Sequence, residues 1–410
     1  MVESGMTLQM AEIASQRQNN ASPRRAMLRK IAAFAKVGAM AGLLSACQMV
    51  PKAEGPVVVA PPDKPVETIE PGLPTDTDRH RVALLVPQTG PNADVGNAIA
   101  NATTLALLDT KTERVRITTY DTALGAAAAA QQAVADGNRL ILGPLLTEDV
   151  AAVAPVARAA KVPVLSFSND SGVAGNGVFI MGFVPGQSVE RVVAYARGKG
   201  HTRFGALVPK NVYGDRSAAA FRAAVTEAGG TLVAVETYDR SATALTGAAR
   251  RIANAGAMDA VLIADSGGNA VRAVPIIKGT GGKQILGTEL WNTDASLGSN
   301  PAMRGSWFAS VSDGLYGQMA GSYRTRFGKA PYRLASLGYD SVLLTVRIAR
   351  EWKPGTAFPM SRLLAADGFG GIDGIFRFNN RGIAVRALEV SEVGAGGFRT
   401  VDPAPTKWPQ

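Results

Sequence analysis

Residues 81–108 read RVALLVPQTGPNADVGNAIANATTLALL and contain the unit from which we expect the fold to be built. Arg81–Val86 is a short apolar run typical of a buried strand, a Gly/Pro loop follows, and Asp94–Leu108 is an Ala-rich helical stretch. Parallel strands that are buried on both faces have near-continuous apolar sequences, and each needs a crossover connection. The stretch therefore predicts a strand–loop–helix unit of a parallel sheet.

The same unit recurs in two series along the chain. Further strands are predicted at 115–120, 140–142, 162–167, 204–208, 231–235, 260–264 and 284–287. Helices are predicted between them at 123–136, 148–160, 187–199, 214–228, 243–255 and 268–278. Two such series indicate an α/β fold of two doubly wound parallel-sheet lobes, a clamshell.

The C-terminal part changes character, with predicted helices at 315–327 and 334–352 and a hairpin-like strand pair at 374–378 and 386–393. These helices must cover a sheet face that one lobe has already begun, so the chain is expected to cross the hinge more than once. We expect a domain at 79–400. Its lobe 1 would be 79–184 plus about 313–368, its lobe 2 would be 185–312 plus about 369–400, and 401–410 would be a loose tail.

Composition excludes several classes of protein. The chain has 410 residues, of which 46% are hydrophobic and 19% charged, too apolar a balance for extensive disorder. One Cys excludes a disulfide framework and a multi-thiolate metal site, and two distant His disfavour imidazole chemistry. The net charge is +10, and without residues 1–46 it is +6, with 37 basic and 31 acidic residues. This remaining charge is dispersed and contains no Lys/Arg run that would indicate nucleic acid. We therefore predict a protein that is not an enzyme and has no metal or cofactor.

The N-terminal residues have the pattern of an export signal. An apolar run at 31–46 follows a basic segment that contains Arg24, Arg25, Arg29 and Lys30. This run is too short to span a bilayer comfortably, which is typical of a secretion signal. The small residues before Cys47 resemble the bacterial lipobox, which implies a signal peptide at 1–46 and lipidation of Cys47. The alternative to lipidation is that Cys47 is a small buried residue of an amphipathic helix. Residues 22–29 also resemble a twin-arginine signal, so the export route stays open.

A Pro-rich segment separates this signal from the α/β pattern. Residues 51–78 contain seven prolines and no helical period, so 47–78 is predicted to be a lipid-anchored, semi-rigid tether. At about 3.1 Å per residue, residues 51–78 would reach at most about 87 Å. Gln48 stands where lipoproteins retained at the inner membrane commonly have Asp, and the resemblance thereby implies transfer to the outer membrane, on its periplasmic side.

Ligands of open parallel sheets bind beyond the carboxyl ends of the strands, so the loops there are informative. These loops read PQTGP (87–91), GPLLT (143–147), SFSND (166–170), NVYGD (211–215), DSGG (265–268) and GTELW (287–291). Their small, hydroxylic and aromatic side chains suit hydrogen-bonded recognition better than acid–base catalysis. The candidate cleft residues are Gln88, Thr147, Ser166, Ser168, Asn169, Tyr213, Ser266, Glu289 and Trp291.

Several stretches resemble the periplasmic-binding-protein type I superfamily, in its leucine/isoleucine/valine-binding branch, from about Arg79 to Thr400. They include VALLVPQTGPNADVGNAIANA, LILGPLLTEDVAAVAP, VPVLSFSND, GHTRFGALVPKNVYGDRSAAAF, ILGTELW and LGYDSV. GPLLTEDV, VPVLSFSND and the lipobox are most similar to the penicillin-binding-protein activator lipoproteins. The Pro-rich tether stands in place of the helical-repeat domain of their enterobacterial members.

The resemblance implies roles for individual residues. Thr147 and the segment 166–168 would hold a ligand carboxylate, Tyr213 would line the site and Glu289 would bind an ammonium group. Val95 stands where amino-acid binders usually have Tyr, and these loops contain no Arg or Lys. A cleft with a vestigial polar lining therefore remains the alternative to a working site.

Two functions follow from the resemblance. The preferred one is a non-enzymatic periplasmic lipoprotein that contacts and stimulates a peptidoglycan synthase. The alternative is a substrate-binding lipoprotein of an ABC importer for amino acids or similar small ligands.

Overall fold

The computed structural model describes residues 78–239 and 241–408. The predicted signal segment, Cys47 and nearly all of the predicted tether lie outside the described residues. Within the described part, no helix is long and apolar enough to cross a bilayer.

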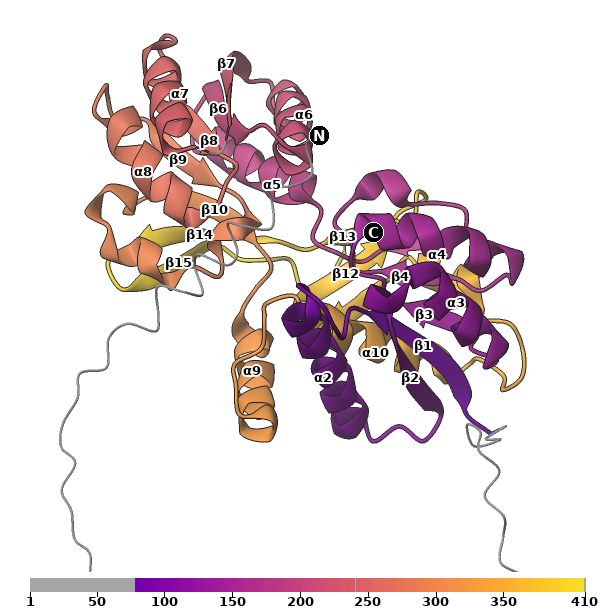
Figure 1. Ribbon diagram of the computed structural model, residues 1–410. Helices are drawn as coiled ribbons and strands as arrows, with labels where there is room; N and C mark the ends of the chain where they lie inside the picture. Colours follow the sequence, from indigo (N-terminus) through magenta and orange to yellow (C-terminus); the bar gives the residue numbers. More distant parts are fainter. Residues whose placement is uncertain (1–77, 240, 409–410) are drawn as a thin grey trace, which may run out of the picture. The chain divides into compact units, whose positions relative to one another are not determined.

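The first sheet is parallel throughout, in the order β2-β1-β3-β4-β5. Its strands are β1 (His80–Val86), β2 (Val115–Asp121), β3 (Leu140–Leu142), β4 (Val164–Ser166) and β5 (Val178–Ile180). The helices α3 (Ala126–Ala135) and α4 (Thr147–Ala159) cover one face, while α2 (Ala93–Thr110) and α10 (Ala335–Ala349) cover the other (Figure 1). Successive β1 residues alternate between the two faces, which explains the unbroken apolar run.

The second sheet has the order β15-β14-β10-β9-β8-β6-β7. Its strands are β6 (Arg203–Pro209), β7 (Thr231–Tyr238), β8 (Ala260–Ile263), β9 (Gln284–Gly287), β10 (Trp307–Ser310), β14 (Glu389–Gly394) and β15 (Gly397–Asp402). The five adjacent strands β10, β9, β8, β6 and β7 are parallel to one another. At one edge, β14 and β15 are added as antiparallel strands. The helices α5 (Pro185–Gly198) and α6 (Val212–Glu227) cover one face, and α7 (Ala242–Asn254) and α8 (Gly267–Lys278) cover the other. The predicted two-lobe α/β fold is confirmed.

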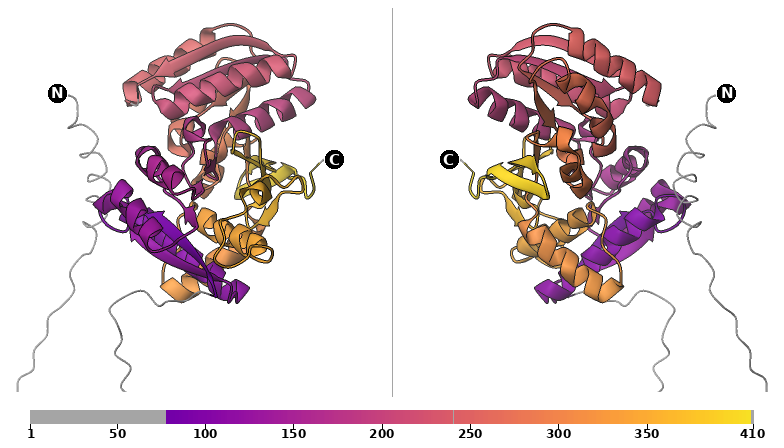
Figure 2. Two further views of the ribbon diagram at one scale, coloured as in Figure 1. Left: turned by 90° about the vertical axis from the view of Figure 1, so that its right-hand side faces the viewer. Right: turned by 90° about the vertical axis from the view of Figure 1, so that its left-hand side faces the viewer.

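The late part of the chain returns to the first sheet. The helix α9 (Gly314–Phe327) packs with α2 and α10, and Figure 2 shows these orange helices beside the indigo start of the domain. The strands β11 (Phe369–Gly371), β12 (Gly374–Phe378) and β13 (Ala384–Arg386) form a small antiparallel sheet. Lobe 1 is therefore 78–184 plus 314–386, lobe 2 is 185–313 plus 389–402, and the chain crosses between them near 184, 313 and 387.

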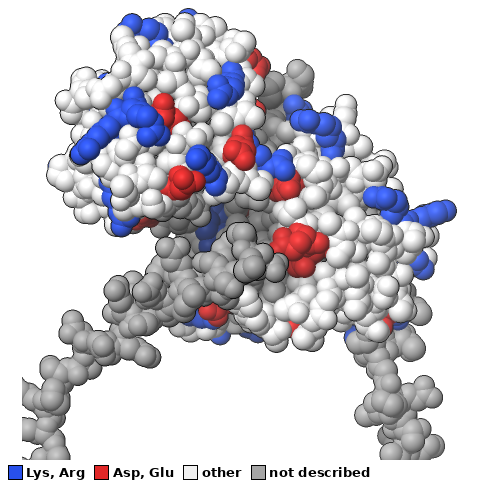
Figure 3. All heavy atoms as spheres, turned by 45° about the horizontal axis from the view of Figure 1, so that its top comes forward, with Lys and Arg blue, Asp and Glu red and all other residues white. Residues whose placement is uncertain are grey.

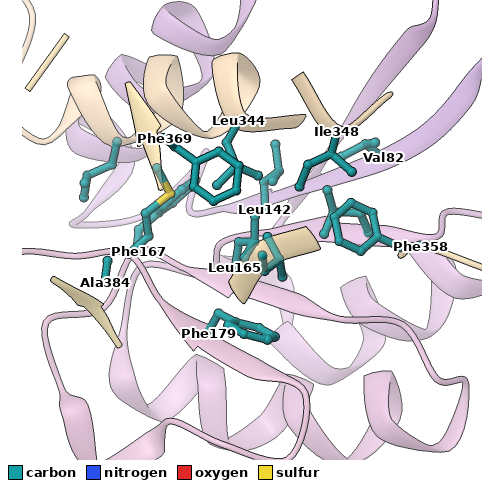
Figure 4. Packing of buried hydrophobic residues seen from close by; sticks show 14 of the residues in the cluster. Val82, Leu142, Leu165, Phe167, Phe179, Leu344, Ile348, Phe358, Phe369 and Ala384 are labelled. Atoms are coloured by element: carbon teal, nitrogen blue, oxygen red, sulfur yellow. The ribbon is translucent and has the colours of Figure 1, made fainter. Parts of the chain in front are cut away.

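Two expectations about this late part were wrong. Residues 369–386 were assigned to lobe 2, but Phe369 and Ala384 pack in the same core as Val82 and Leu344 of lobe 1 (Figure 4). The expected pairing of 374–378 with 386–393 also fails, because β12 pairs with β11 and β13 while β14 pairs with β10. Burial of the phenylalanines of β11 and β12 against lobe 1 separates the two halves of that supposed hairpin.

The C-terminal tail is more ordered than expected. The strand β15 continues to Asp402, and the Trp408 ring lies 4.7 Å from the Arg377 guanidinium. A cation over an indole face is attracted by the ring quadrupole, which holds this end of the chain against β12.

In each lobe, the helix that follows the first strand of the sheet approaches the end of that strand so closely that only glycine fits. A Cβ on Gly96 would lie 1.8 Å from the Pro87 carbonyl oxygen, and one on Gly214 would lie 1.8 Å from that of Pro209. Both glycines are in the first turn of their helices, α2 and α6. The two lobes thus use the same contact to fix the loop between a central strand and its helix.

Replacing Gly214 should destabilise lobe 2. Gly214→Ala places a methyl group inside the van der Waals radius of a backbone oxygen, so we expect a loss of about 2–3 kcal/mol in the free energy of unfolding. Denaturant unfolding followed by circular dichroism measures it. The control is Gly321→Ala in α9, where the added Cβ meets no heavy atom within 4 Å. It should be neutral or stabilising by up to about 1 kcal/mol, and equal losses in both variants would contradict the account.

Candidate functional site

A cavity of about 480 Å³ lies beyond the carboxyl ends of β3, β4, β5 and β9 and is lined by both lobes. Its walls are largely apolar, with Leu145, Leu146, Phe167 and Phe183 from lobe 1 and Leu290 from lobe 2. Asn92, Asn169 and Thr293 add neutral polar groups, and Glu289 and Arg333 add charges of opposite sign. A mostly apolar cavity with a few convergent polar groups is the usual form of a small-molecule site.

Glu289 is held by hydroxyl groups of lobe 2. It follows β9, where Ser188 of α5 donates to its Oε2 and the Tyr213 hydroxyl of α6 donates to its Oε1 at 2.9 Å. The Tyr213 oxygen also lies 2.8 Å from Thr288 Oγ1. Among the described residues, no cation forms an ion pair with this carboxylate. The site thus presents to the cavity an acid that has hydroxyl donors but no counter-charge.

The electrostatics of this group follow from its burial. Removal from water raises the pKa of Glu289, although the Ser188 and Tyr213 hydroxyls oppose the shift. Burial also raises the pKa of Tyr213 well above its ordinary value, and the nearby Glu289 charge adds to this. Tyr213 therefore stays protonated at neutral pH and remains a donor to Glu289.

Arg333 is the charged group on the lobe-1 wall. It precedes α10, its Nη1 lies 2.7 Å from Asp373 Oδ1, and its Nη2 lies 3.3 Å from Asp313 Oδ1. Its guanidinium lies over Tyr316 at 4.0 Å from the ring centroid. Only 12% of the side chain is exposed, and its Nε and Nη2 have no hydrogen-bond partner among the described residues.

A buried charged cluster lies behind this wall. Asp340 and Asp373 are fully buried, as is the guanidinium of Arg386, which donates to the Met181 carbonyl oxygen. Asp340 Oδ1 accepts from the Ile372 amide at 2.7 Å. The cavity residue Phe183 has Arg386 at 4.9 Å from its ring centroid and Arg333 at 5.7 Å. The cluster therefore supports the wall that carries Arg333.

The structure gathers several predicted site residues. Asn169 and Glu289 line the cavity, and Tyr213 is hydrogen-bonded to Glu289. The hydroxyls of Thr147 and Ser168 are 3.0 Å apart, just behind Asn169, where they connect two adjacent loops. Ser166 is fully buried and donates to the Pro144 carbonyl oxygen, so its hydroxyl is committed to the protein.

Three predicted residues lie elsewhere. Trp291 is fully buried in the lobe-2 core and donates through its indole N–H to the Asp265 carbonyl oxygen. The backbone N–H of Gln88 donates to Asp121 Oδ1 at 2.8 Å, and Gln88 does not line the cavity. Ser266 is exposed, just before α8. Position after a strand was the signal for all three, and it does not distinguish a side chain that points into the cavity from one that points into the core.

Sequence reasoning missed Arg333, Phe183 and Leu290. Arg333 lies before a helix, not after a strand, and reaches the cavity only because α10 returns to lobe 1. Phe183 follows β5, a strand of three apolar residues that was not among the predicted strands. Leu290 stands between Glu289 and Trp291, the two residues of this loop that were predicted to line the cavity. No His/Cys/Asp/Glu group able to hold a metal ion occurs within the described ranges.

Comparison with known proteins agrees with this geometry. A sequence profile of the family described as "Periplasmic binding protein" matches residues 80–397. A protein of Rickettsia prowazekii (strain Madrid E), described as uncharacterized, is 27% identical over 175 residues, which are 42% of this chain and 47% of that protein. The chain thus aligns with about half the length of this curated relative.

Solved structures share the fold. A branched chain amino acid ABC transporter periplasmic ligand-binding protein from Burkholderia xenovorans LB400 has a TM-score of 0.65 at 16% identity, covering 79% of this chain and 94% of its own. LivJ from Streptococcus pneumoniae, in complex with isoleucine, has 0.58 at 20%, covering 79% and 100%. An ABC-transporter solute binding protein from Rhodopseudomonas palustris BisB5, in complex with 3,4-dihydroxy benzoic acid, has 0.61 at 22%, covering 81% and 97%. At these identities the similarity shows the fold alone.

The charged cluster predicts a pH dependence of stability. Burial, with a further contribution from the Asp373 charge, raises the pKa of Asp340 from 3.8 to about 7. The folded state therefore keeps a proton that the unfolded chain releases near pH 4, so this group's contribution to the free energy of unfolding falls as pH rises from about 4 to 7. Asp340→Asn should remove that fall, on the order of 2–4 kcal/mol.

Thermal unfolding between pH 4 and pH 8 measures this effect. The variant should gain stability relative to the unsubstituted protein as pH increases, and exposed Asp239→Asn controls for the change in net charge. Parallel profiles for the unsubstituted protein and Asp340→Asn would contradict a protonated, buried Asp340.

Proposed function

Because the chain belongs to the periplasmic binding protein family, we propose that its cavity binds a small amino-acid-like molecule and that the protein is the substrate-binding component of an ABC importer. The observation that carries the proposal is Glu289, a half-buried carboxylate that lines the cavity and has hydroxyl donors but no cation partner among the described residues. A buried charge without a partner is costly, and a ligand ammonium group would supply the missing partner.

The rest of the lining fits the remainder of such a ligand. Phe167, Phe183 and Leu290 offer apolar surface for a side chain. On the opposite wall, Arg333 is the cation that a ligand carboxylate would face. Similar folds that bind isoleucine and 3,4-dihydroxy benzoic acid support a small carboxylate with an apolar body.

Activation of a peptidoglycan synthase, the function preferred from the sequence, makes a different demand. An activator needs an exposed interface and tolerates an idle cavity. The described residues favour the importer function, because an idle cavity gives no reason to keep the Glu289 carboxylate at its wall without a cation. The protein is periplasmic, as its family implies. Lipidation at Cys47 and attachment to the outer membrane are further parts of the proposal that rest on the sequence.

Glu289→Gln tests the proposed site. The amide keeps the shape but loses the charge, and loss of one member of a desolvated pair costs about 2–5 kcal/mol, or roughly 30- to 4000-fold in affinity. Thermal-shift screening of amino acids, followed by calorimetry on the strongest binder, measures the loss. The matched control is Glu113→Gln, at an exposed position outside the cavity. It should leave affinity unchanged.

Ligand analogues sharpen the test. An analogue of the ligand that lacks the carboxylate should bind with an affinity that does not depend on Arg333. An analogue that lacks the amine should bind the unsubstituted protein and Glu289→Gln with equal affinity. Two results together would show that the proposal is wrong. The first is that no amino-acid-like molecule stabilises the protein. The second is that pull-downs from membranes recover a peptidoglycan synthase, and recover as much of it with Glu289→Gln as with the unsubstituted protein.

A further inference from the structure

An ion pair joins the two lobes beside the cavity. Arg216 lies in α6 of lobe 2, and its Nη2 is paired with Asp170 Oδ1 of lobe 1. Its Nη1 also donates to Ser171 Oγ at 3.2 Å. Asp170 and Ser171 belong to the segment that follows β4, directly after the cavity residue Asn169. The guanidinium of one lobe thus binds two groups of the other lobe at the edge of the proposed site.

Lobe 1 fixes its part of this contact by itself. Asp170 Oδ1 accepts from the Gly172 amide at 2.7 Å, and the Asp170 amide donates to Ser168 Oγ at 3.1 Å. The Ser168 hydroxyl lies 3.0 Å from that of Thr147. Hydroxyls that the sequence suggested for a ligand carboxylate therefore build the loop that presents Asp170. A carboxylate held in this way loses little side-chain freedom when it pairs with Arg216.

In lobe 2, the first turn of α6 serves both the interlobe pair and the acid of the cavity. Tyr213 and Arg216 are three residues apart in this helix and therefore lie on one side of it. Tyr213 donates to Glu289, while Arg216 reaches lobe 1. A movement of α6 that separates the lobes would therefore break the ion pair and carry Tyr213 and Glu289 away from the lobe-1 wall.

The pair is shielded from water more than a typical surface pair. The exposed fraction of the side chain is 15% for Asp170 and 34% for Arg216. A Cβ on Gly172 would lie 3.1 Å from Arg216 Nη2, so the guanidinium packs directly on the backbone of lobe 1. Arg216 Nε is buried and has no hydrogen-bond partner among the described residues, a cost that limits the net strength of the contact. The pair can therefore favour contact of the lobes and still break.

The contact depends on individual residues and not on a broad field of charge. On the face that Figure 3 displays, basic and acidic side chains are intermixed. Arg333 and Asp313 also join the two lobes, but Asp313 lies at a crossing of the chain, where motion of one lobe changes distances least. Arg216 and Asp170 belong to no crossing, so their pairing depends on how closely the lobes approach.

We propose that Arg216 and Asp170 form a latch that holds the two lobes together over the cavity before a ligand enters. The inference rests on the proposed function, because it assigns a control to the same site. When only part of the molecules has the binding-competent arrangement, the apparent affinity falls by that fraction. By favouring the arrangement in which Glu289 faces the lobe-1 wall, the latch raises the apparent affinity and slows the escape of a bound molecule.

Distances between spin labels on the two lobes test the latch without any ligand. The full chain carries Cys47→Ser, which removes its only Cys. Labels are then attached at Leu124→Cys in lobe 1 and Thr243→Cys in lobe 2, both at exposed positions. Double electron–electron resonance gives the distribution of distances between the two labels.

The latch variants are Arg216→Gln, Asp170→Asn and the two combined. Each single variant should shift the distribution to longer distances, because the ratio of closed to open molecules falls about threefold to tenfold. The combined variant should open no further than either single one, since both remove the same interaction. The matched control is Arg251→Gln, which removes an ion pair with Glu236 inside lobe 2 and should leave the distances unchanged.

Unchanged distances in both single latch variants, or shifts that add in the combined variant, would overturn the latch. The result is separate from the test of the proposed function. If the thermal-shift screen finds no amino-acid-like ligand, the proposed function fails while the label distances still decide the latch. If a ligand is found and the latch variants keep the distances of the unsubstituted residues, the latch alone is wrong.

Discussion

The contact of a helix start with a strand end, made once in each lobe through Gly96 and Gly214, is the constraint on which the site depends. In lobe 2 it brings the first turn of α6 against Pro209, so that Tyr213 reaches the carboxylate of Glu289 from the neighbouring helix. In lobe 1 the same contact fixes Asn92, at the end of the loop, and Val95, in the first turn of α2. A side chain at either glycine would displace cavity-lining groups as well as the helix.

Charge is distributed differently on the two walls of the cavity. The lobe-1 cation, Arg333, is balanced by Asp373 inside the same lobe and is supported by the buried cluster with Asp340 and Arg386. The lobe-2 anion, Glu289, has hydroxyl partners only. The uncompensated group is thus the acid, and a cationic group on the ligand would gain most from entering. This asymmetry distinguishes the account from one in which the cleft is idle.

The sequence predicted most of the parallel architecture, because short apolar runs bounded by Gly and Pro report burial on both faces. It also placed Tyr213 and Glu289 together through the loops that follow strands. Prediction from the sequence failed where the chain returns to lobe 1 late in the sequence. Phe369 and Ala384 pack in the lobe-1 core, and Arg333 lines the cavity, but no local sequence pattern indicates either placement. Trp291 was misplaced because a side-chain direction cannot be read from position alone.

A crystal structure of the full chain with its strongest calorimetric binder tests the central claim most directly. The account predicts the ligand amine about 2.8 Å from an oxygen of Glu289, with the apolar part of the ligand against Phe167 and Phe183. A ligand bound outside this cavity, or one inside it with its amine directed away from Glu289, would contradict the claim.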